Sequence, residues 1–181
     1  MIQIQALLAI YREAGSEDYI GEPISQLEHA QQAALLARKA GANSDVVLAA
    51  FFHDIGHLCA PLNAAEMDGL GVLNHESIGA EFLRTHGLRG MVPDLVELHV
   101  QAKRYLCCRN QIYRSRLSAA SRGTLAFQGG VMTEAEAADF ESHPLFRDIL
   151  RLRAWDEAAK EPNGEGLTLA KVEQLLNHYG A

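Results

Sequence analysis

The hydrophobic residues of this chain recur at helical spacing throughout its length. Near the N-terminus, Leu7, Leu8 and Tyr11 fall on one side of a helix predicted over residues 2–14, which ends before Gly15. No segment shows the sustained alternation of apolar and polar residues that a half-buried strand requires. The pattern therefore predicts an all-α protein.

Helix-capping signals mark where further helices begin. Ser25-x-x-Glu28 and Thr133-x-x-Glu136 are capping boxes, in which two side chains satisfy free backbone N–H groups at a helix start. Together with glycine and proline positions, these signals predict helices over residues 25–41, 44 to about 60, 75–85, 92–108, 133–141, 144–160 and 167–179. This organisation is typical of a helical bundle.

Composition bounds the class of protein. A chain of 181 residues, 48% hydrophobic and 22% charged, is long enough for one domain with a full core, so we expect a single domain over residues 1–181. It has no apolar run of membrane-spanning length and no signal-peptide pattern at its N-terminus. Three cysteines without a Cys-x-x-Cys pair favour a reducing compartment and argue against a thiolate zinc site. We therefore expect a cytoplasmic protein without a membrane partner.

The charge distribution argues against nucleic acid as a ligand but leaves a small anion possible. A net charge of −7 argues against nucleic-acid binding. Between Glu97 and Glu134, however, the sequence has no acidic residue and contains the basic residues Lys103, Arg104, Arg109, Arg114, Arg116 and Arg122. This stretch is either a solvated basic face or a local positive field for a small anion.

A series of histidines predicts a metal site. One histidine falls on each of four successive predicted helices, and one of the four is followed directly by an aspartate: His29, His53-Asp54, His75 and His99. Helices of a bundle bring their inward faces together, which is how such ligands build a metal site in a bundle core. The two carboxylate oxygens of Asp54 could serve one metal or bridge two. Asp156 is the best candidate for a second carboxylate, although it could also be a surface residue.

The order H…HD…H…H…D resembles the HD-domain superfamily of metal-dependent phosphohydrolases. This resemblance implies an HD-domain helical bundle with a two-metal centre in its core. One metal would be held by His29, His53 and Asp156, the other by His75 and His99, with Asp54 bridging them. Imidazole and carboxylate ligands suit iron, manganese or zinc, and their spacing does not choose among these metals.

A narrower resemblance chooses among them. Four segments resemble the organophosphonate-degrading oxygenases of this superfamily, which are relatives of inositol oxygenase: residues 18–22, 25–29, 99–106 and 153–156. The resemblance implies a mixed-valent Fe(II)/Fe(III) pair, with O2 as co-substrate. It also implies cleavage of the C–P bond of a small anionic organophosphonate, 1-hydroxy-2-aminoethylphosphonate, which gives phosphate and glycine or an N-methylated glycine.

The same resemblance assigns roles to residues outside the metal cluster. Lys103 and Arg153, with His57 and Ser121, would hold the phosphonate oxygens, a task that suits the arginine fork and the lysine point charge. Lys103 could instead be a solvated residue, and Ser121 a helix cap.

Two loop residues would form a gate. The Tyr19 phenol would occupy the open position on the iron held by His75 and His99 until the substrate ammonium pairs with Glu22. Without the resemblance, Tyr19 and Glu22 would be taken as ordinary loop residues.

Three other interpretations fit parts of the sequence. A plain HD phosphohydrolase acting on a nucleotide or phosphomonoester would use the same metal ligands. His53 and His57 could form a degenerate zinc-protease motif, but an aspartate replaces its glutamate and Gly56 weakens the helix. A non-catalytic HD module would be expected to have lost some ligands, whereas the set here is complete.

Overall fold

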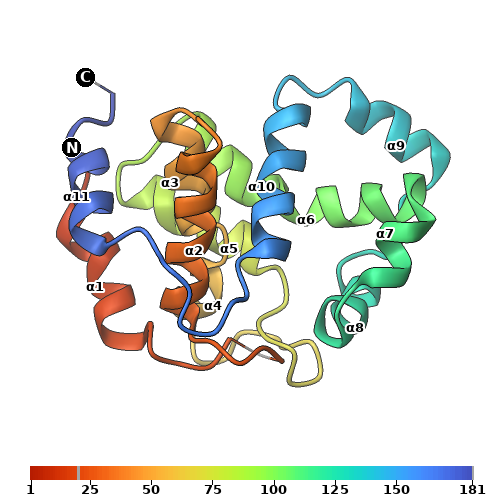
Figure 1. Ribbon diagram of the computed structural model, residues 1–181, viewed down its shortest axis with the longest axis horizontal. Helices are drawn as coiled ribbons and strands as arrows, with labels where there is room; N and C mark the ends of the chain where they lie inside the picture. The colour runs from red at the N-terminus through yellow and green to blue at the C-terminus, as the bar shows by residue number, and fades with distance from the viewer. Residues whose placement is uncertain (20, 181) are drawn as a thin grey trace.

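The computed structural model describes residues 1–19 and 21–180, which form helices joined by loops (Figure 1). The helices are α1 (Ile4–Ala14), α2 (Gln26–Lys39), α3 (Ser44–Phe52), α4 (Ile55–Cys59), α5 (His75–Thr85), α6 (Met91–Arg109), α7 (Gln111–Arg116), α8 (Ala119–Phe127), α9 (Glu134–Glu141), α10 (Phe146–Ala158) and α11 (Leu169–Asn177). Across the described residues, β pairing is limited to isolated bridges. The all-α prediction is confirmed, and no helix in these ranges is long and apolar enough to cross a membrane.

Both predicted capping boxes are present. The Ser25 hydroxyl accepts a hydrogen bond from the backbone N–H of Glu28 at 3.2 Å, and the Glu28 carboxylate accepts one from the N–H of Ser25. Thr133 and Glu136 make the same reciprocal pair at the start of α9. These contacts fix the starts of α2 and α9 where the sequence predicted them.

The predicted helix from residue 44 to about 60 is wrong in one respect, because it is broken at the His-Asp pair. α3 ends at Phe52, and Asp54 stands at the start of a second short helix, α4, with φ −104° and ψ 10°. Neighbouring side chains on a regular helix point about 100° apart, so a break allows both ligand types to turn toward the same cluster. The cap of α3 is Asn43, one residue before the predicted start.

Two short helices, α7 and α8, were not predicted. They lie with α9 at the end of the molecule opposite α1 and α11 (Figure 1). α7 buries no residue fully, and α8 buries only Thr124 and Leu125, so neither shows the apolar stripe that predicts a helix. The side chain of Ser118 caps α8 by accepting a hydrogen bond from the N–H of Ser121 at 3.2 Å. Ser121 is therefore inside the helix, not its cap.

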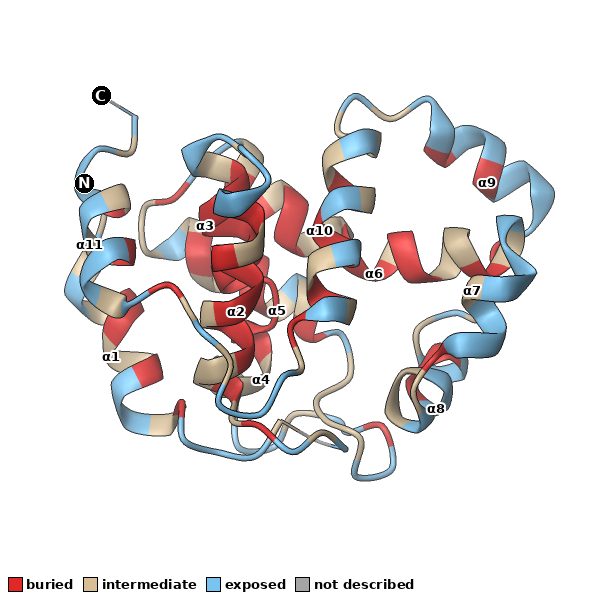
Figure 2. Cartoon of the chain, viewed as in Figure 1, coloured by how far each residue is buried: buried red, intermediate tan, exposed pale blue. Residues whose placement is uncertain are grey.

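The core is built around α3, which has the sequence SDVVLAAFF and is apolar on every side after its first turn. Such a helix must be surrounded, and α3 packs against α2, α6 and α10. Figure 2 shows the buried residues concentrated in these central helices, whereas α7 and α9 are mostly exposed. The histidines of α2 and α6 and the pair that follows α3 therefore face a common interior.

Two glycines let α4 and α5 approach each other closely. A Cβ on Gly56 would lie 1.8 Å from the backbone oxygen of His75, and a Cβ on Gly79 would lie 3.0 Å from the nitrogen of Gly56. No other residue fits such a contact without moving the backbone. The contact places the start of α5, and with it His75, beside Asp54.

Candidate metal centre and anion site

The four histidines of the predicted series meet in the core, although they come from separate segments. His29 lies on α2, His53 directly after α3, His75 at the start of α5 and His99 in the middle of α6. All four are buried, with at most 4% of their surface exposed.

Each imidazole uses its Nδ1 on a backbone carbonyl. The distances from Nδ1 to the carbonyl oxygen are 2.8 Å for His29 with Ala159, 2.9 Å for His53 with Ala50, 3.3 Å for His75 with Val72 and 2.7 Å for His99 with Val96. A carbonyl oxygen only accepts hydrogen bonds, so Nδ1 carries a proton and Nε2 is the nitrogen that could bind a metal ion. Metal-ligating histidines are usually oriented in this way.

Asp54 divides its two carboxylate oxygens between two pairs of histidines. Its Oδ2 lies 3.6 Å from Nε2 of His29 and 3.3 Å from Nε2 of His53. Its Oδ1 lies 3.4 Å from Nε2 of both His75 and His99. Asp54 therefore belongs to both groups that could hold a metal ion, which is the geometry of a bridging carboxylate.

Asp156, on α10, adds a second carboxylate to one of these groups. Its Oδ1 lies 3.5 Å from Nε2 of His29 and 3.8 Å from Nε2 of His53, and the residue is only 3% exposed. The reading of Asp156 as a surface residue is wrong. Its other oxygen accepts a hydrogen bond from Arg153, which fixes the carboxylate toward the histidines.

The charges of the cluster stabilise a cation. Burial raises the pKa of Asp54, but the imidazoles around it, His53 first, outweigh burial and hold that pKa well below its usual value. Burial lowers the pKa of His53, yet the carboxylates of Asp54 and Asp156 outweigh it and raise the pKa to about 10. The carboxylates thus favour positive charge at this position, which a metal ion supplies as well as a proton does. The donor set fits metal ions.

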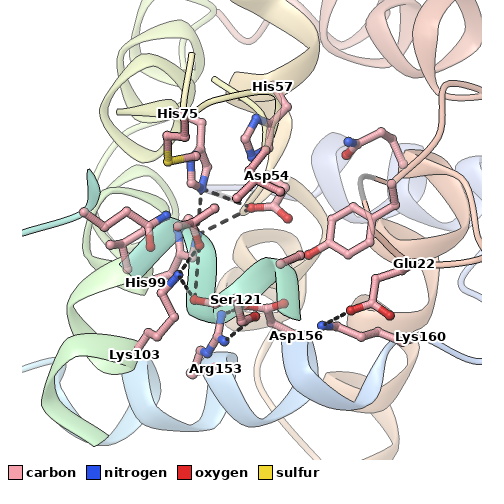
Figure 3. Close-up of a pocket in the computed structure, with 18 residues that line it drawn as sticks. Glu22, Asp54, His57, His75, His99, Lys103, Ser121, Arg153, Asp156 and Lys160 are labelled. Carbon is pink, nitrogen blue, oxygen red and sulfur yellow. Dashed lines mark hydrogen bonds and ion pairs between the residues drawn. The ribbon is translucent and has the colours of Figure 1, made fainter. Parts of the chain in front are cut away.

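A small cavity opens onto the cluster (Figure 3). Its volume is about 70 Å³, which suits a molecule of few heavy atoms. Four residues of the histidine–aspartate cluster line it: Asp54, His75, His99 and Asp156. The residues predicted to contact the substrate also line it: Tyr19, Glu22, His57, Lys103, Ser121 and Arg153. The structure therefore brings together metal-ligand types and cations from distant parts of the chain.

Lys103 is the cation of this cavity with the least compensation. It is 3% exposed, so it is not a solvated helix residue, and its ammonium donates to Oγ1 of Thr124 at 2.8 Å. Burial, and then the charge of Arg153, lower the pKa of Lys103 to about 7. An anion beside it would restore the charged form, so the site favours an anionic ligand.

The Arg153 guanidinium is already engaged by protein groups. It contacts the carboxylates of Asp156 and Glu157, and its Nε donates to the hydroxyl of Tyr113 at 2.9 Å. Its Nη2 lies 3.5 Å from Oγ of Ser121. Arg153 therefore orients Asp156. An anion in the cavity would have to share the positive charge of Arg153 with the carboxylates of Asp156 and Glu157.

His57 lines the cavity beside His75, with the two rings stacked at 4.0 Å between centroids. Its Nδ1 accepts a hydrogen bond from the N–H of Val72 at 3.1 Å. Burial, and then His75, lower the pKa of His57 to about 3, so the ring is neutral and its Nε2 carries the proton. It can therefore donate one hydrogen bond to an oxygen of a ligand.

The loop before α2 brings Tyr19 and Glu22 to the cavity; Ile20, between them, lies outside the described residues. The Tyr19 ring stacks on His29 at 3.9 Å, with 15° between the ring planes. Burial, and then the carboxylate of Asp54, raise the pKa of Tyr19 well above its usual value. Glu22 accepts a hydrogen bond from Lys160 at 2.8 Å, a partner that the sequence analysis did not identify.

Thr124, whose hydroxyl accepts a hydrogen bond from the ammonium of Lys103, was not predicted from the sequence. Thr124 lies three residues after Ser121, about one helical turn, but this spacing is informative only once α8 is known to be a helix, and Lys160 lies beyond the end of α10. The basic stretch divides between two roles. Lys103 enters the cavity, whereas Arg104 and Arg109 pair with carboxylates of α9.

Comparison with known proteins identifies the family of this chain. The HD domain family matches residues 26–122, which is more than half of the chain. The chain therefore belongs to the HD domain family. The matched range contains the four histidines and Asp54, and Asp156 follows it on α10.

Three relatives match nearly the whole chain. An uncharacterized protein of Acanthamoeba polyphaga mimivirus is 42% identical over 97% of this chain and 78% of its own length. The [1-hydroxy-2-(trimethylamino)ethyl]phosphonate dioxygenase (glycine-betaine-forming) of Leisingera caerulea is 37% identical over 90% of this chain and 82% of its own. The hydroxymethylphosphonate dioxygenase of Gimesia maris is 38% identical over 97% and 89%. Both relatives with a named activity are phosphonate dioxygenases.

Proposed function

We propose that this protein is a diiron dioxygenase that cleaves the C–P bond of a small 1-hydroxyalkylphosphonate. The observation that carries the proposal is the cavity in which Lys103 faces the cluster organised by Asp54. Residues that could bind an anion and residues that could hold two metal ions line the same cavity, and the two named relatives act on 1-hydroxylated phosphonates.

The reaction balances without an external reductant. A 1-hydroxyalkylphosphonate and O2 give a carboxylate and phosphate: hydroxymethylphosphonate gives formate, and 2-amino-1-hydroxyethylphosphonate gives glycine. Two irons, in the Fe(II)/Fe(III) state that the resemblance implies, would supply the one-electron chemistry that activates O2. His29, His53 and Asp156 would hold one iron, His75 and His99 the other, and Asp54 both.

The protein groups around the cavity would bind and orient the phosphonate. Lys103 offers a charge-assisted hydrogen bond, and His57 donates one from Nε2. Ser121 would offer its hydroxyl to a phosphonate oxygen, and Arg153 would offer any N–H group that does not contact Asp156 or Glu157. Holding the phosphonate in this way would direct C1 and its hydroxyl toward the cluster.

Tyr19 and Glu22 would control access. The Tyr19 ring stacks on His29, which belongs to the other histidine pair than the one that the predicted gate assigns to Tyr19. Tyr19 also lines the cavity, so a substrate that enters would displace its side chain. In the gate predicted from the sequence, the substrate ammonium would pair with Glu22 and draw the loop away, an induced-fit step.

The test is phosphate release under defined oxygen. Protein loaded with iron under limited air should bind about two irons per chain and show a mixed-valent spectroscopic signal. With hydroxymethylphosphonate it should release one phosphate for each O2 consumed, and none under anaerobic conditions. An HD phosphohydrolase would instead release phosphate from a phosphomonoester without consuming O2, and that result would overturn the proposal.

A further inference from the structure

Glu22, the residue expected to receive a substrate ammonium, already has an ammonium partner in this chain. The Nζ of Lys160 lies 2.8 Å from Oε1 of Glu22. Both side chains line the cavity and are mostly buried, with 17% of Lys160 and 15% of Glu22 exposed. Figure 3 shows the pair at the right of the cavity, with Lys103 at the left. The pair therefore forms the wall away from Lys103.

The position of Lys160 is fixed by hydrogen bonds of its two neighbours in the chain, Ala159 and Glu161. The carbonyl of Ala159 accepts the Nδ1–H of His29, at 2.8 Å. Glu161 exchanges two hydrogen bonds with the side chain of Gln32, at 2.8 and 3.1 Å. The segment that carries Lys160 is thus tied to α2, the helix that also carries the candidate ligand His29. The ammonium lies 6.0 Å from the centroid of the Tyr19 ring, which adds a cation–π contact.

A cationic group on the substrate would meet an unfavourable arrangement here. The negative charge of Glu22 is already compensated, so a second ammonium beside it would be repelled by Lys160 or would have to displace it. An uncharged group at the same position would leave the ion pair intact. The two relatives with named activities differ at this position of the substrate, because one name carries a trimethylamine group and the other has no group beyond C1.

We propose that Lys160 is a specificity-determining residue that occupies the ammonium site of Glu22, so that this enzyme prefers 1-hydroxyalkylphosphonates without a cationic group. The identity of the substrate rests on the proposed function, whereas the preference for an uncharged over a cationic group beside Glu22 and Lys160 does not. It also revises the predicted gate, because Glu22 then pairs with the protein's own ammonium.

Two substrates of nearly equal size can separate the effect of the charge of the substrate from the effect of its volume. 2-Amino-1-hydroxyethylphosphonate and 1-hydroxypropylphosphonate differ only in an ammonium against a methyl group. We expect kcat/KM of the wild type, measured by O2-dependent phosphate release, to be higher for the propyl compound. Lys160→Met should raise the ratio of amine to propyl at least ten-fold. A wild type that prefers the amine, or an unchanged ratio in Lys160→Met, would overturn the proposal.

Two further variants control for folding and for loss of an ion pair. The double variant Lys160→Met/Glu22→Gln leaves no charge unpaired and should treat the two substrates alike. Lys39→Met removes an exposed ion pair with Glu165. Neither residue lines the cavity, and the lysine side chain is 60% exposed, so this variant should keep the wild-type ratio. A shifted ratio in Lys39→Met, or retained discrimination in the double variant, would contradict the role of Lys160.

A binding measurement separates failure of this proposal from failure of the proposed function. Calorimetry with propylphosphonate and 2-aminoethylphosphonate needs no turnover. We expect the wild type to bind propylphosphonate more tightly and Lys160→Met to reverse the order. If no phosphonate is turned over but this reversal is seen, the proposed function is wrong and the Lys160 site stands. Turnover without any effect of Lys160 in either assay overturns the Lys160 site alone.

Discussion

The Nε2 atoms of His75 and His99 lie 3.2 Å apart, and each ring donates its Nδ1–H to a backbone carbonyl. Two imidazoles with this tautomer present lone pairs to each other, which is unfavourable unless a cation lies close to both. The Nε2 atoms of His29 and His53 lie 3.1 Å apart. The protein thus has two pairs of imidazole nitrogens that could each hold a metal ion, and Asp54 contacts both pairs.

Asp54→Asn should abolish binding of both metal ions together, because each oxygen of the carboxylate faces one histidine pair. His75→Ala removes a ligand from one pair only and should leave about one ion per chain, since the other pair keeps its ligands. Metal analysis after dialysis against a weak chelator measures the difference. If Asp54→Asn still holds two ions per chain, the carboxylate does not bridge.

Gly56→Ala should disturb the metal cluster through the backbone. The added methyl group would collide with the backbone oxygen of His75, 1.8 Å from the ideal Cβ position, so α4 and α5 must separate. We expect a loss of about 1–3 kcal/mol in the free energy of unfolding, typical of overpacking, together with a lower metal content.

Gly41→Ala provides the matched control for this loss. Gly41 has φ +71° with no atom within 4 Å of an added Cβ, so it strains the backbone by about 1–2 kcal/mol without approaching the site. Denaturant unfolding and metal analysis of both variants separate the two effects. An equal metal content in Gly56→Ala and Gly41→Ala would show that the close approach does not position His75.

The sequence predicted that these histidines would meet in the core, because one histidine per helix is a local signal that a bundle turns into a cluster. It did not predict the break between Phe52 and Asp54, because an apolar run such as VVLAAFF continues a helical pattern and carries no local signal for a break, whereas the close approach of Gly56 to His75 is seen only in the folded chain. Tertiary contacts of this kind override local propensity.

The ion pair of Glu22 with Lys160 was missed for a related reason. The two residues are 138 positions apart, and no periodicity links a loop glutamate to a lysine after α10. The same holds for Thr124, whose hydroxyl meets Lys103 across 21 positions through a helix that the hydrophobic pattern did not reveal. Charged pairs on different elements are set by the packing of the chain, not by local sequence.

Lys103→Met should weaken binding of the anionic substrate without removing metal. A desolvated charge contact of this kind is worth about 2–5 kcal/mol, so kcat/KM should fall accordingly. Lys171→Met, at an exposed lysine of α11, is the matched control and should behave as wild type.

The same residue predicts a pH dependence. Burial and Arg153 lower the pKa of Lys103 to about 7, so its positive charge is present below that pH and is lost as the pH rises through it. Affinity for inorganic phosphate should therefore fall as the pH rises, less steeply in Lys103→Met. If the two affinities fall in parallel, Lys103 does not contact the anion.

Tyr19→Phe should uncouple oxygen consumption from phosphate release while leaving the metal content unchanged. The phenyl ring preserves the stacking on His29, at 3.9 Å in the wild type, and only the hydroxyl beside the carboxylate of Asp54 is lost. If that hydroxyl shields the cluster until substrate enters, its removal exposes the cluster to O2 at all times. The ratio of O2 consumed to phosphate released should then rise above the value of about one that the balanced reaction requires. Tyr105→Phe, which removes a surface hydrogen bond to Glu141, should keep the wild-type ratio. Equal ratios in Tyr19→Phe and Tyr105→Phe would leave Tyr19 a packing residue and exclude the gate.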